Sequence, residues 1–536
     1  TKMKNFDDDD VDVEANAIIT SNNDNNNNNI DYNDDYVDSG GGVVLEQPHH
    51  YQQQHHDDNI NSNSINIQHD DQSQQSQQSQ QQYRYFLKLH RLNHGVSYLN
   101  IVASYVASFL SICFFVFINV AQPLILSNSL NIPDDKQGSV SGDLTFYNEI
   151  VVLLTSHAWG LMSDRMGRRI VYVLGLVIMG LGLGAYPFAN HIWVLMIFRA
   201  VFAVGAAAAS SMLSAVLGDY VLFEDRGKSS GLLGFCAGGG AVLGSLVLLK
   251  IPNFIDSHSN VGITMSAQLT YCLTSAMAFF GAAFLWFGLQ RIKDLKVHQE
   301  RASVMTVAKE GLLAGKNPIL SLSYASGFIA RGDSAIATTF LSLWIYQYAL
   351  AHNGGNKIDA LSKSGTITGI AQTFGLFFAP VAGYLCDKLN RIMAMVAIAL
   401  LGCIGYYMLA FNNDPLSISF MVGACIIGCT ETGMVVSSTA LVAQESPKEC
   451  RGSVGGFFSF CGAIGILIGS KLGGIYFDRW NGFPFALFGV FSSMLAVAGV
   501  VVYFFDRRRQ RQTGHPAAQE SPNISSLAPD SAPLIE

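Results

Sequence analysis

Charged residues are scarce in this chain of 536 residues, in which Asp, Glu, Lys and Arg make up 13% of the sequence. A soluble protein carries about 25%, so the low value excludes a chain whose surface lies mainly in water. The nine cysteines are an odd number and all lie in the apolar body, which argues against a disulfide-stapled secreted domain. The basic residues form no patch with interleaved aromatics, so we expect no nucleic-acid partner.

The charge that is present is unevenly divided along the chain. Residues 1–83 contain 16 acidic and 2 basic side chains, whereas residues 84–536 contain 24 acidic and 30 basic ones. The first part consists of runs of Asn, Asp, Gln and Ser, which cannot bury enough apolar surface to offset their ordering entropy. It also lacks the apolar core and basic start of a signal peptide. We therefore expect a disordered cytosolic head over 1–94 and a disordered tail over 507–536.

Long apolar runs separated by short polar breaks fill the rest of the chain. Each has at least about 19 residues, enough to cross ~30 Å of hydrocarbon as an α-helix. They lack the polar faces that helices of a soluble protein need. The sequence thus predicts an all-α membrane protein with twelve transmembrane helices, at 98–126, 144–162, 170–188, 192–216, 229–250, 265–289, 319–349, 364–386, 392–411, 416–443, 453–477 and 483–505.

Lys and Arg are distributed asymmetrically between the loops that join these runs. With a cytosolic N-terminus, the inner loops hold 15 of them and the outer loops hold 5. The positive-inside rule therefore predicts that both termini are cytosolic. The longest internal break is a linker over 290–318, and its stretch 302–314 has the spacing of an amphipathic helix that lies along the membrane surface.

The two sets of six runs, 95–289 and 319–506, repeat each other in sequence. Segment 160–168 matches 383–391 at an offset of 223, and a second match at an offset of 225 has eight identities in 20 positions. Six spans per half give both halves the same orientation, so the repeat is parallel, an arrangement used for alternating access. We expect two pseudo-symmetric six-helix bundles.

The loop sequence Gly-Leu-Met-Ser-Asp-Arg-Met-Gly-Arg-Arg at 160–169 resembles the signature of the major facilitator superfamily between its second and third helices. Leu195 and Arg199 on the fourth run resemble a second family pattern, from which Phe202 and Ala203 depart. The fifth run lacks the Gly-Pro pair of the family's drug antiporters, which disfavours that subfamily. The resemblance covers about 95–506 and implies the two-bundle fold. It also implies a cytosolic gate, with simple positive-inside anchoring as the alternative, at Gly160, Asp164, Arg165, Gly167, Arg168, Arg169, Arg226, Asp387, Arg391 and Arg451.

Six charged side chains fall inside the predicted spans, where each costs about 2.5–3.5 kcal/mol or more at mid-bilayer if it faces lipid. We expect them to bind substrate or protons, or to form structural ion pairs: Glu149, Arg199, Arg331, Asp333, Glu431 and Lys471. Matching depths along their helices predict the pairs Glu149–Arg199 and Arg331–Glu431.

Two polar side chains of the first span, Asn119 and Gln122, share a helix face because they lie three positions apart. They are predicted either to hydrogen-bond the substrate or to hold neighbouring helices together.

These features predict a secondary active transporter that moves a small organic solute across the bilayer by alternating access, and they leave proton coupling open. The alternative is a non-transporting receptor or trafficking partner built on the same scaffold, which the charges inside the spans disfavour. No nucleophile–base pair, phosphate-binding loop or metal-ligand cluster is recognisable, so we expect no enzyme activity, no cofactor and no metal. We expect a monomer in the plasma membrane or, because residues 530–535 resemble an acidic dileucine sorting signal, in an endolysosomal membrane.

Overall fold

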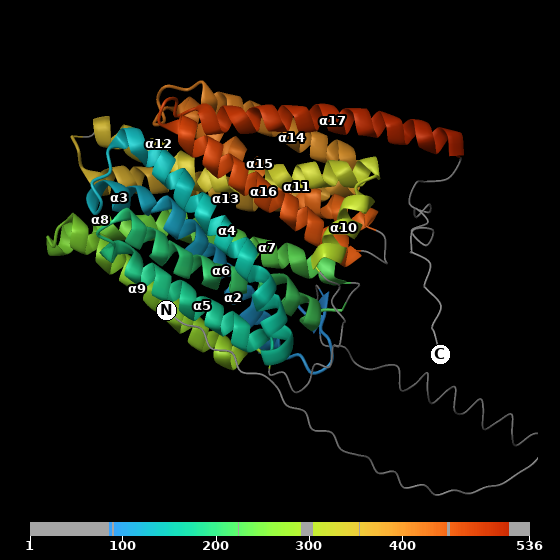
Figure 1. The fold of residues 1–536 in the computed structure, drawn as a ribbon, viewed down its shortest axis with the longest axis horizontal. Coiled ribbons are helices and arrows are strands. Elements are labelled where there is room, and N and C mark those ends of the chain that lie inside the picture. Colours follow the sequence, from blue (N-terminus) through green and yellow to red (C-terminus); the bar gives the residue numbers. More distant parts are fainter. Residues whose placement is uncertain are drawn as a thin grey trace, which may run out of the picture. The chain divides into compact units, whose positions relative to one another are not determined.

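The described part of the chain is almost entirely helical (Figure 1). The computed structural model describes residues 85–87, 90–222, 225–290, 304–352, 354–446 and 451–513. Each of the twelve apolar runs coincides with one helix or with a series of consecutive helices. In chain order these are α2 (Tyr98–Val120) and α3 (Gln122–Asn128); α4 (Asp134–Met166); α5 (Arg168–Ala185) and η1 (Tyr186–Phe188); α6 (Ile192–Tyr220); α7 (Arg226–Val242), η3 (Leu243–Val247), η4 (Leu248–Lys250) and α8 (Ile251–Ser259); α9 (Ile263–Gly288); α11 (Pro318–Ile336), η6 (Ala337–Leu341) and α12 (Ser342–His352); α13 (Lys357–Lys388); α14 (Arg391–Ala410); α15 (Ile418–Glu445); α16 (Arg451–Phe477); and α17 (Phe483–Thr513).

Ten of these helical segments are long and apolar enough to cross a membrane. The other two are α4 and the series from α11 to α12, which carry several of the charged side chains discussed below. Both were predicted as spans, and both are present as long helices. The helix starts lie up to ten residues before the predicted ones, because the first turns of α4 and α13 are polar and are invisible to a hydropathy pattern.

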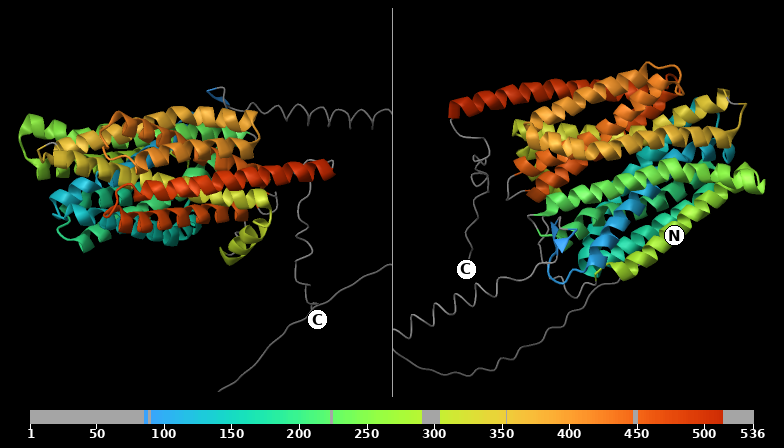
Figure 2. Two further views of the ribbon diagram at one scale, coloured as in Figure 1. Left: turned by 90° about the horizontal axis from the view of Figure 1, so that it is seen from above. Right: turned by 180° about the vertical axis from the view of Figure 1, so that it is seen from behind.

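The helices form the two predicted bundles, one from α2 to α9 and one from α11 to α17 (Figure 2). Each bundle has its own apolar core, with Phe114 and Tyr172 among the fully buried residues of the first and Phe340 and Phe488 among those of the second. The first core also takes in Tyr346 of α12 and Leu361 of α13, so the two bundles share apolar packing there.

The segments that flank the bundles differ from the sequence prediction. Residues of the expected head form two short paired strands, β1 (Tyr85–Phe86) and β2 (His90–Arg91), that pack against the first bundle. At the other end α17 continues to Thr513, seven residues beyond the predicted boundary at 506. In the linker, α10 (Val304–Ala314) lies within the stretch expected to be helical and packs against α16, where Ser453 donates to Glu310 at 2.6 Å.

Candidate functional site

The two bundles approach each other most closely where α4 crosses α16. The Cβ atom of any side chain at Gly142 would come within 2.7 Å of the Gly474 Cα, and one at Gly474 would come within 2.9 Å of the Gly138 carbonyl oxygen. Only glycine therefore permits this crossing, as at the small-residue interfaces of membrane helices. We call this the closed end of the molecule.

Polar contacts reinforce the closed end. The Asp478 carboxylate, after the last residue of α16, accepts hydrogen bonds from the Gly138 N–H at 2.7 Å, the Ser139 N–H at 2.9 Å and the Ser139 hydroxyl at 2.5 Å. A negative charge at the first turns of α4 also interacts favourably with the helix dipole. Asp478 thus joins the two halves through hydrogen bonds, a role that was not predicted from the sequence.

Lys471, predicted to bind substrate or a proton, instead forms an ion pair with Asp143 of α4 at 2.6 Å. The sequence interpretation missed Asp143 because the second span was drawn from residue 144, one position too late. The pair joins α16 to α4 and so belongs to the closed end.

The opposite end of the bundles is open. There, α7, α13 and α16 carry glycines at which an added Cβ would meet no atom within 4 Å: Gly227, Gly231, Gly234, Gly383, Gly452 and Gly455. Because the same helices are in tight contact at the closed end, the two bundles diverge toward this end. We call it the open end, and it contains the signature loop.

The first bundle buries Arg199 of α6 completely, against side chains of α2 and α3. Its guanidinium donates to the Asn119 side-chain oxygen and, at 3.4 Å, to that of Gln122. The structure therefore brings together three of the predicted site residues. The predicted pair Glu149–Arg199 is not formed: the guanidinium donates to amide oxygens instead, and its Nε has no hydrogen-bond partner among the described residues.

Glu149 is buried on α4, and the charged side chain that acts on it is Arg331 of α11, in the other bundle. One turn closer to the closed end, the hydroxyls of Thr145 and Thr339 lie 3.3 Å apart across the same interface. The predicted pair Arg331–Glu431 is not formed: no ion pair or hydrogen bond joins these two described side chains, and the Glu431 carboxylate accepts from Gln372 at 3.0 Å instead.

The second bundle holds two carboxylates close together. Asp333 of α11 is 1% exposed and lies beside Glu431 of α15 and Tyr406 of α14. The Glu431 carboxylate accepts a hydrogen bond from Gln372 of α13 at 3.0 Å, whereas the Asp333 Oδ1 has no partner among the described residues. An unpartnered buried carboxylate oxygen is costly, so Asp333 is a buried polar group that the described part of the fold leaves partly unsatisfied.

A pocket between the two bundles adjoins Glu431. Its lining comes from both halves and is mainly apolar with a few polar groups: Val116, Val120, Ser245, Ala337, Thr338, Leu341, Thr368, Ala371, Gln372, Ile427, Gly428 and Glu431. Two irregular segments, the π-helical turns η3 and η6, contribute Ser245 and Thr338, and such turns inside helices are frequent at functional sites. Glu431 is the only charged side chain in the lining, so the polarity of the pocket depends on it.

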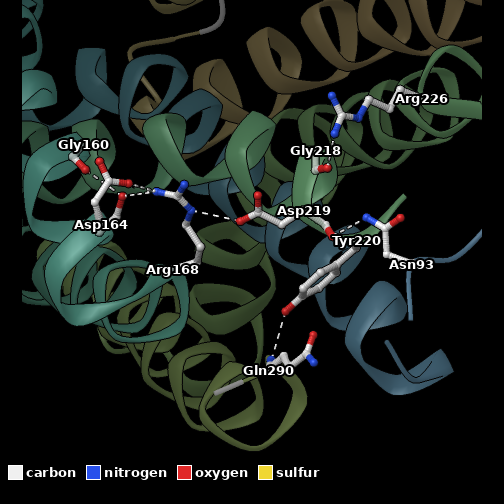
Figure 3. A network of polar contacts seen from close by, with 10 residues as sticks. Asn93, Gly160, Asp164, Arg168, Gly218, Asp219, Tyr220, Arg226 and Gln290 are labelled. Atoms are coloured by element: carbon white, nitrogen blue, oxygen red, sulfur yellow. Dashed lines mark hydrogen bonds and ion pairs between the residues drawn. The ribbon is translucent and has the colours of Figure 1, made fainter. Parts of the chain in front are cut away.

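The signature loop at the open end forms a network within the first bundle (Figure 3). The Arg168 guanidinium bonds the Asp164 carboxylate of α4 at 2.8 Å and the Asp219 carboxylate of α6 at 3.0 Å. Gly167, with φ of +92°, makes the turn between α4 and α5. The loop therefore ties the ends of three helices together, and Asp219 is a member that the sequence interpretation missed although it follows the predicted fourth span by only three residues.

The other predicted gate residues of the first half surround this network. Gly160 accepts a hydrogen bond from Ser163, Arg226 bonds the Gly218 carbonyl oxygen at 2.5 Å, and the Arg169 guanidinium stacks 4.3 Å from the Trp286 ring centre. Arg165 is exposed at the end of α4.

The second copy of the motif is not equivalent to the first. Arg391 bonds the Ala440 carbonyl oxygen at 3.1 Å, Asp387 is exposed, and Arg451 is described by its backbone alone. Asn390 takes the place of the turn glycine and caps α14 by accepting from the Ile392 N–H at 3.0 Å. The degenerate copy therefore keeps the turn but not the ion-pair network.

Comparison with known proteins agrees with this architecture. The model of the Major Facilitator Superfamily matches residues 104–470 and 327–534. Magnetosome protein MamH of Paramagnetospirillum magneticum is 27% identical over 70% of this chain and 86% of its own length. Multidrug resistance protein 2 of Bacillus subtilis is 24% identical over 68% of this chain and 85% of its own. The crystal structure of the nucleoside transporter NupG superposes with a TM-score of 0.58 over 76% of this chain and 99% of that chain, at 14% identity, and so shares the fold.

Proposed function

Because the chain belongs to the Major Facilitator Superfamily, whose members carry small molecules across membranes and are not enzymes, we propose that it is a proton-coupled transporter of a small organic solute. The observation that carries the coupling is the pair of carboxylates, Asp333 and Glu431, beside a pocket that both bundles line. The names of its relatives, which include a magnetosome protein, a multidrug resistance protein and a nucleoside transporter, differ too much to assign the solute.

The carboxylate pair is suited to holding a proton. Two neighbouring carboxylates away from water repel each other if both are ionised, so the pair binds one proton between them and titrates as a unit. Glu431 reaches the pocket and Asp333 is buried behind it. Protons thus enter and leave through Glu431. Asp333 opposes negative charge on Glu431 when it is ionised itself and permits that charge when it is protonated.

In this conformation the pocket has a volume of about 10 Å³, room for about one water molecule, so the solute enters only once the two bundles have moved apart around it. The aliphatic walls of the pocket suit an uncharged or weakly polar body, and the hydroxyls of Thr338 and Thr368 and the Gln372 amide offer hydrogen bonds that fix its orientation. Binding of the solute beside Glu431 changes the environment of that carboxylate. Occupancy of the pocket is thereby linked to the protonation state of Glu431.

Alternating access follows from the two ends of the molecule. We place the open end in the cytosol, with both termini, because the signature loop and the other Lys- and Arg-rich loops lie there. The structure is then the state in which the pocket faces inward and the closed end seals the outside. Opening the outside requires separating α4 from α16, with loss of the Asp478 and Lys471 bonds.

The test is uptake of labelled solutes into proteoliposomes with and without an imposed proton gradient. For the Glu431→Gln variant we expect solute exchange to continue but accumulation driven by the gradient to be lost, since the amide cannot carry a proton. Glu445→Gln makes the same change four turns along α15 and serves as the matched control, which should accumulate solute normally. Undiminished accumulation by Glu431→Gln would contradict the coupling, and no uptake of any solute by the unaltered protein would favour the receptor alternative.

A further inference from the structure

A short segment before the first membrane helix is bound to the connection between α6 and α7. We call residues 85–87 and 90–93 the strap. The Leu222 N–H donates to the Arg91 carbonyl oxygen at 3.2 Å, and the Asn93 N–H donates to the Tyr220 carbonyl oxygen at 2.9 Å. Leu92 and Val221 form the antiparallel bridge between these bonds. The strap thus adds a strand-like edge to the end of α6.

An ion pair fixes the strap to the start of α7. The Arg91 N–H and Nε–H donate to one Asp225 oxygen, at 2.9 and 2.8 Å. These bonds lower the pKa of Asp225 to about 2, so this carboxylate stays charged at every pH that a cell experiences.

His90 lies at the centre of the strap and is 0% exposed. Its Nε2 lies 3.2 Å from the Tyr105 hydroxyl, which lies 2.8 Å from that of Ser229, and its Nδ1 has no hydrogen-bond partner among the described residues. The Phe86 ring packs 5.5 Å away. The charged groups that face His90 are Asp225 and Lys228 from the α7 side, of opposite sign, beside Arg91 on its own strand. Burial outweighs the attraction of Asp225 and lowers the pKa of His90 below its usual value.

The strap and the signature loop both bind Asp219. The Asn93 side chain donates to the Asp219 carbonyl oxygen at 2.8 Å, while Arg168 holds the Asp219 carboxylate at 3.0 Å (Figure 3). The position of Asp219, and with it the anchor of Arg168, therefore depends on whether the strap is docked.

We propose that the strap is a positioning element of the gate at the open end and that His90 releases it when the pH on that side falls. Only the consequence of this proposal, a change in the rate of transport, rests on the proposed function. Docking itself is a property of the chain without solute or gradient.

The direction of the pH effect follows from linkage. A histidine whose pKa is lower in the docked state stabilises docking above its free pKa, near 6.5, and loses that stabilisation as pH falls. Between the free and the docked pKa, each unit of pH weakens docking by up to about tenfold. Asp225 cannot produce this transition, because its pKa lies near 2.

The experiment measures hydrogen–deuterium exchange of the purified full chain between pH 7.5 and 5.5, with rates corrected for intrinsic exchange. The amides of Asn93 and Leu222 report docking, because their partners lie across the contact. We expect protection at pH 7.5 that falls by up to about tenfold by pH 5.5. In His90→Gln, which keeps a polar contact to Tyr105 and cannot titrate, the protection should not change with pH. His94→Gln, an exposed neighbour, is the matched control and should behave like the unaltered chain.

Protection that does not vary with pH in the unaltered chain, or that varies equally in His90→Gln, would overturn the proposal. If His90→Gln is already unprotected at pH 7.5, the His90→Phe variant replaces it, since a phenyl ring fills the space beside Phe86 without titrating. Should both variants fail to dock, a drop in the His94→Gln control centred outside pH 5.5–6.5 would still refute the assignment to His90. A protein that transports nothing yet shows the expected exchange would disprove the proposed function and leave the strap intact.

Discussion

Replacing Gly142 by alanine tests whether the crossing of α4 and α16 holds the closed end together. The added methyl would lie within 2.7 Å of the Gly474 Cα and nearer still to the Ser470 carbonyl oxygen, where ordinary contact begins near 3.4 Å. Both obstacles are backbone atoms, which cannot rotate away. The two helices must therefore separate by at least about 0.7 Å, the difference between 3.4 Å and the distance to the Gly474 Cα.

The size of the effect follows from the cost of overpacking. Inserting a methyl into a tight contact typically costs about 1–3 kcal/mol. Only the closed state contains this contact, so the whole cost falls on one side of the conformational equilibrium. A change of that size shifts the ratio of the two states by about 5- to 150-fold toward the outward-open one. It also lengthens or breaks the three bonds to Asp478 on the same pair of helices.

The assay is a distance distribution between spin labels at position 135, in the first turn of α4, and position 413, in the connection between α14 and α15, both exposed at the closed end, in a chain without its native cysteines. We expect a longer-distance population to appear in Gly142→Ala. Gly402→Ala is the control, because its nearest contacts would be at 3.7 Å within the second bundle. An unchanged distribution in Gly142→Ala would show that the glycine crossing does not hold this end closed.

Two further outcomes can be measured. Asp164→Asn should leave the protein folded but slow transport severely, because it removes the carboxylate that holds Arg168 at 2.8 Å; a normal uptake rate in proteoliposomes would refute this, with Asp359→Asn, an acid at the closed end, as the control. Changing Leu534 and Ile535 to alanine should move a tagged protein to the cell surface if the dileucine-like sequence is a sorting signal; these residues lie outside the described part of the chain, and an unaltered distribution in cells would remove the idea.

Hydropathy could predict the helices, but not which side chains meet. Twelve apolar runs identify twelve helical segments because membrane helices need apolar length and little else. Arg331 and Glu431 lie at similar depths, which made them plausible partners, yet depth says nothing about direction around the helix axis. The charge of Arg331 instead acts on Glu149, in the other bundle, and Glu431 is bonded to Gln372. A single sequence, with no related sequences to compare, does not show in which direction around the helix axis each side chain points.

The site was predicted in part for the same reason. Spacing alone placed Asn119 and Gln122 on one face of the first span, but it did not predict that this face meets Arg199. Asp143 and Asp478 were missed because they lie at the ends of spans, where charged residues are common and do not stand out as site candidates. The strap was missed because seven described residues beside a long polar head give too short a pattern to separate from it.

The glycines without neighbours at the open end have a consequence for how substitutions in this protein are judged. Gly227, Gly231, Gly452 and Gly455 lie in unfilled space in this conformation, so alanine at any of them should leave its stability unchanged or improved. They match one another between the two halves in part, Gly227 corresponding to Gly452. In the proposed transport cycle the halves close over this end, and we expect the same positions to become crossing points there. A survey of substitutions that measured only the stability of the folded protein would therefore show no effect at these glycines. Only a survey that selected for transport activity would reveal that they are needed.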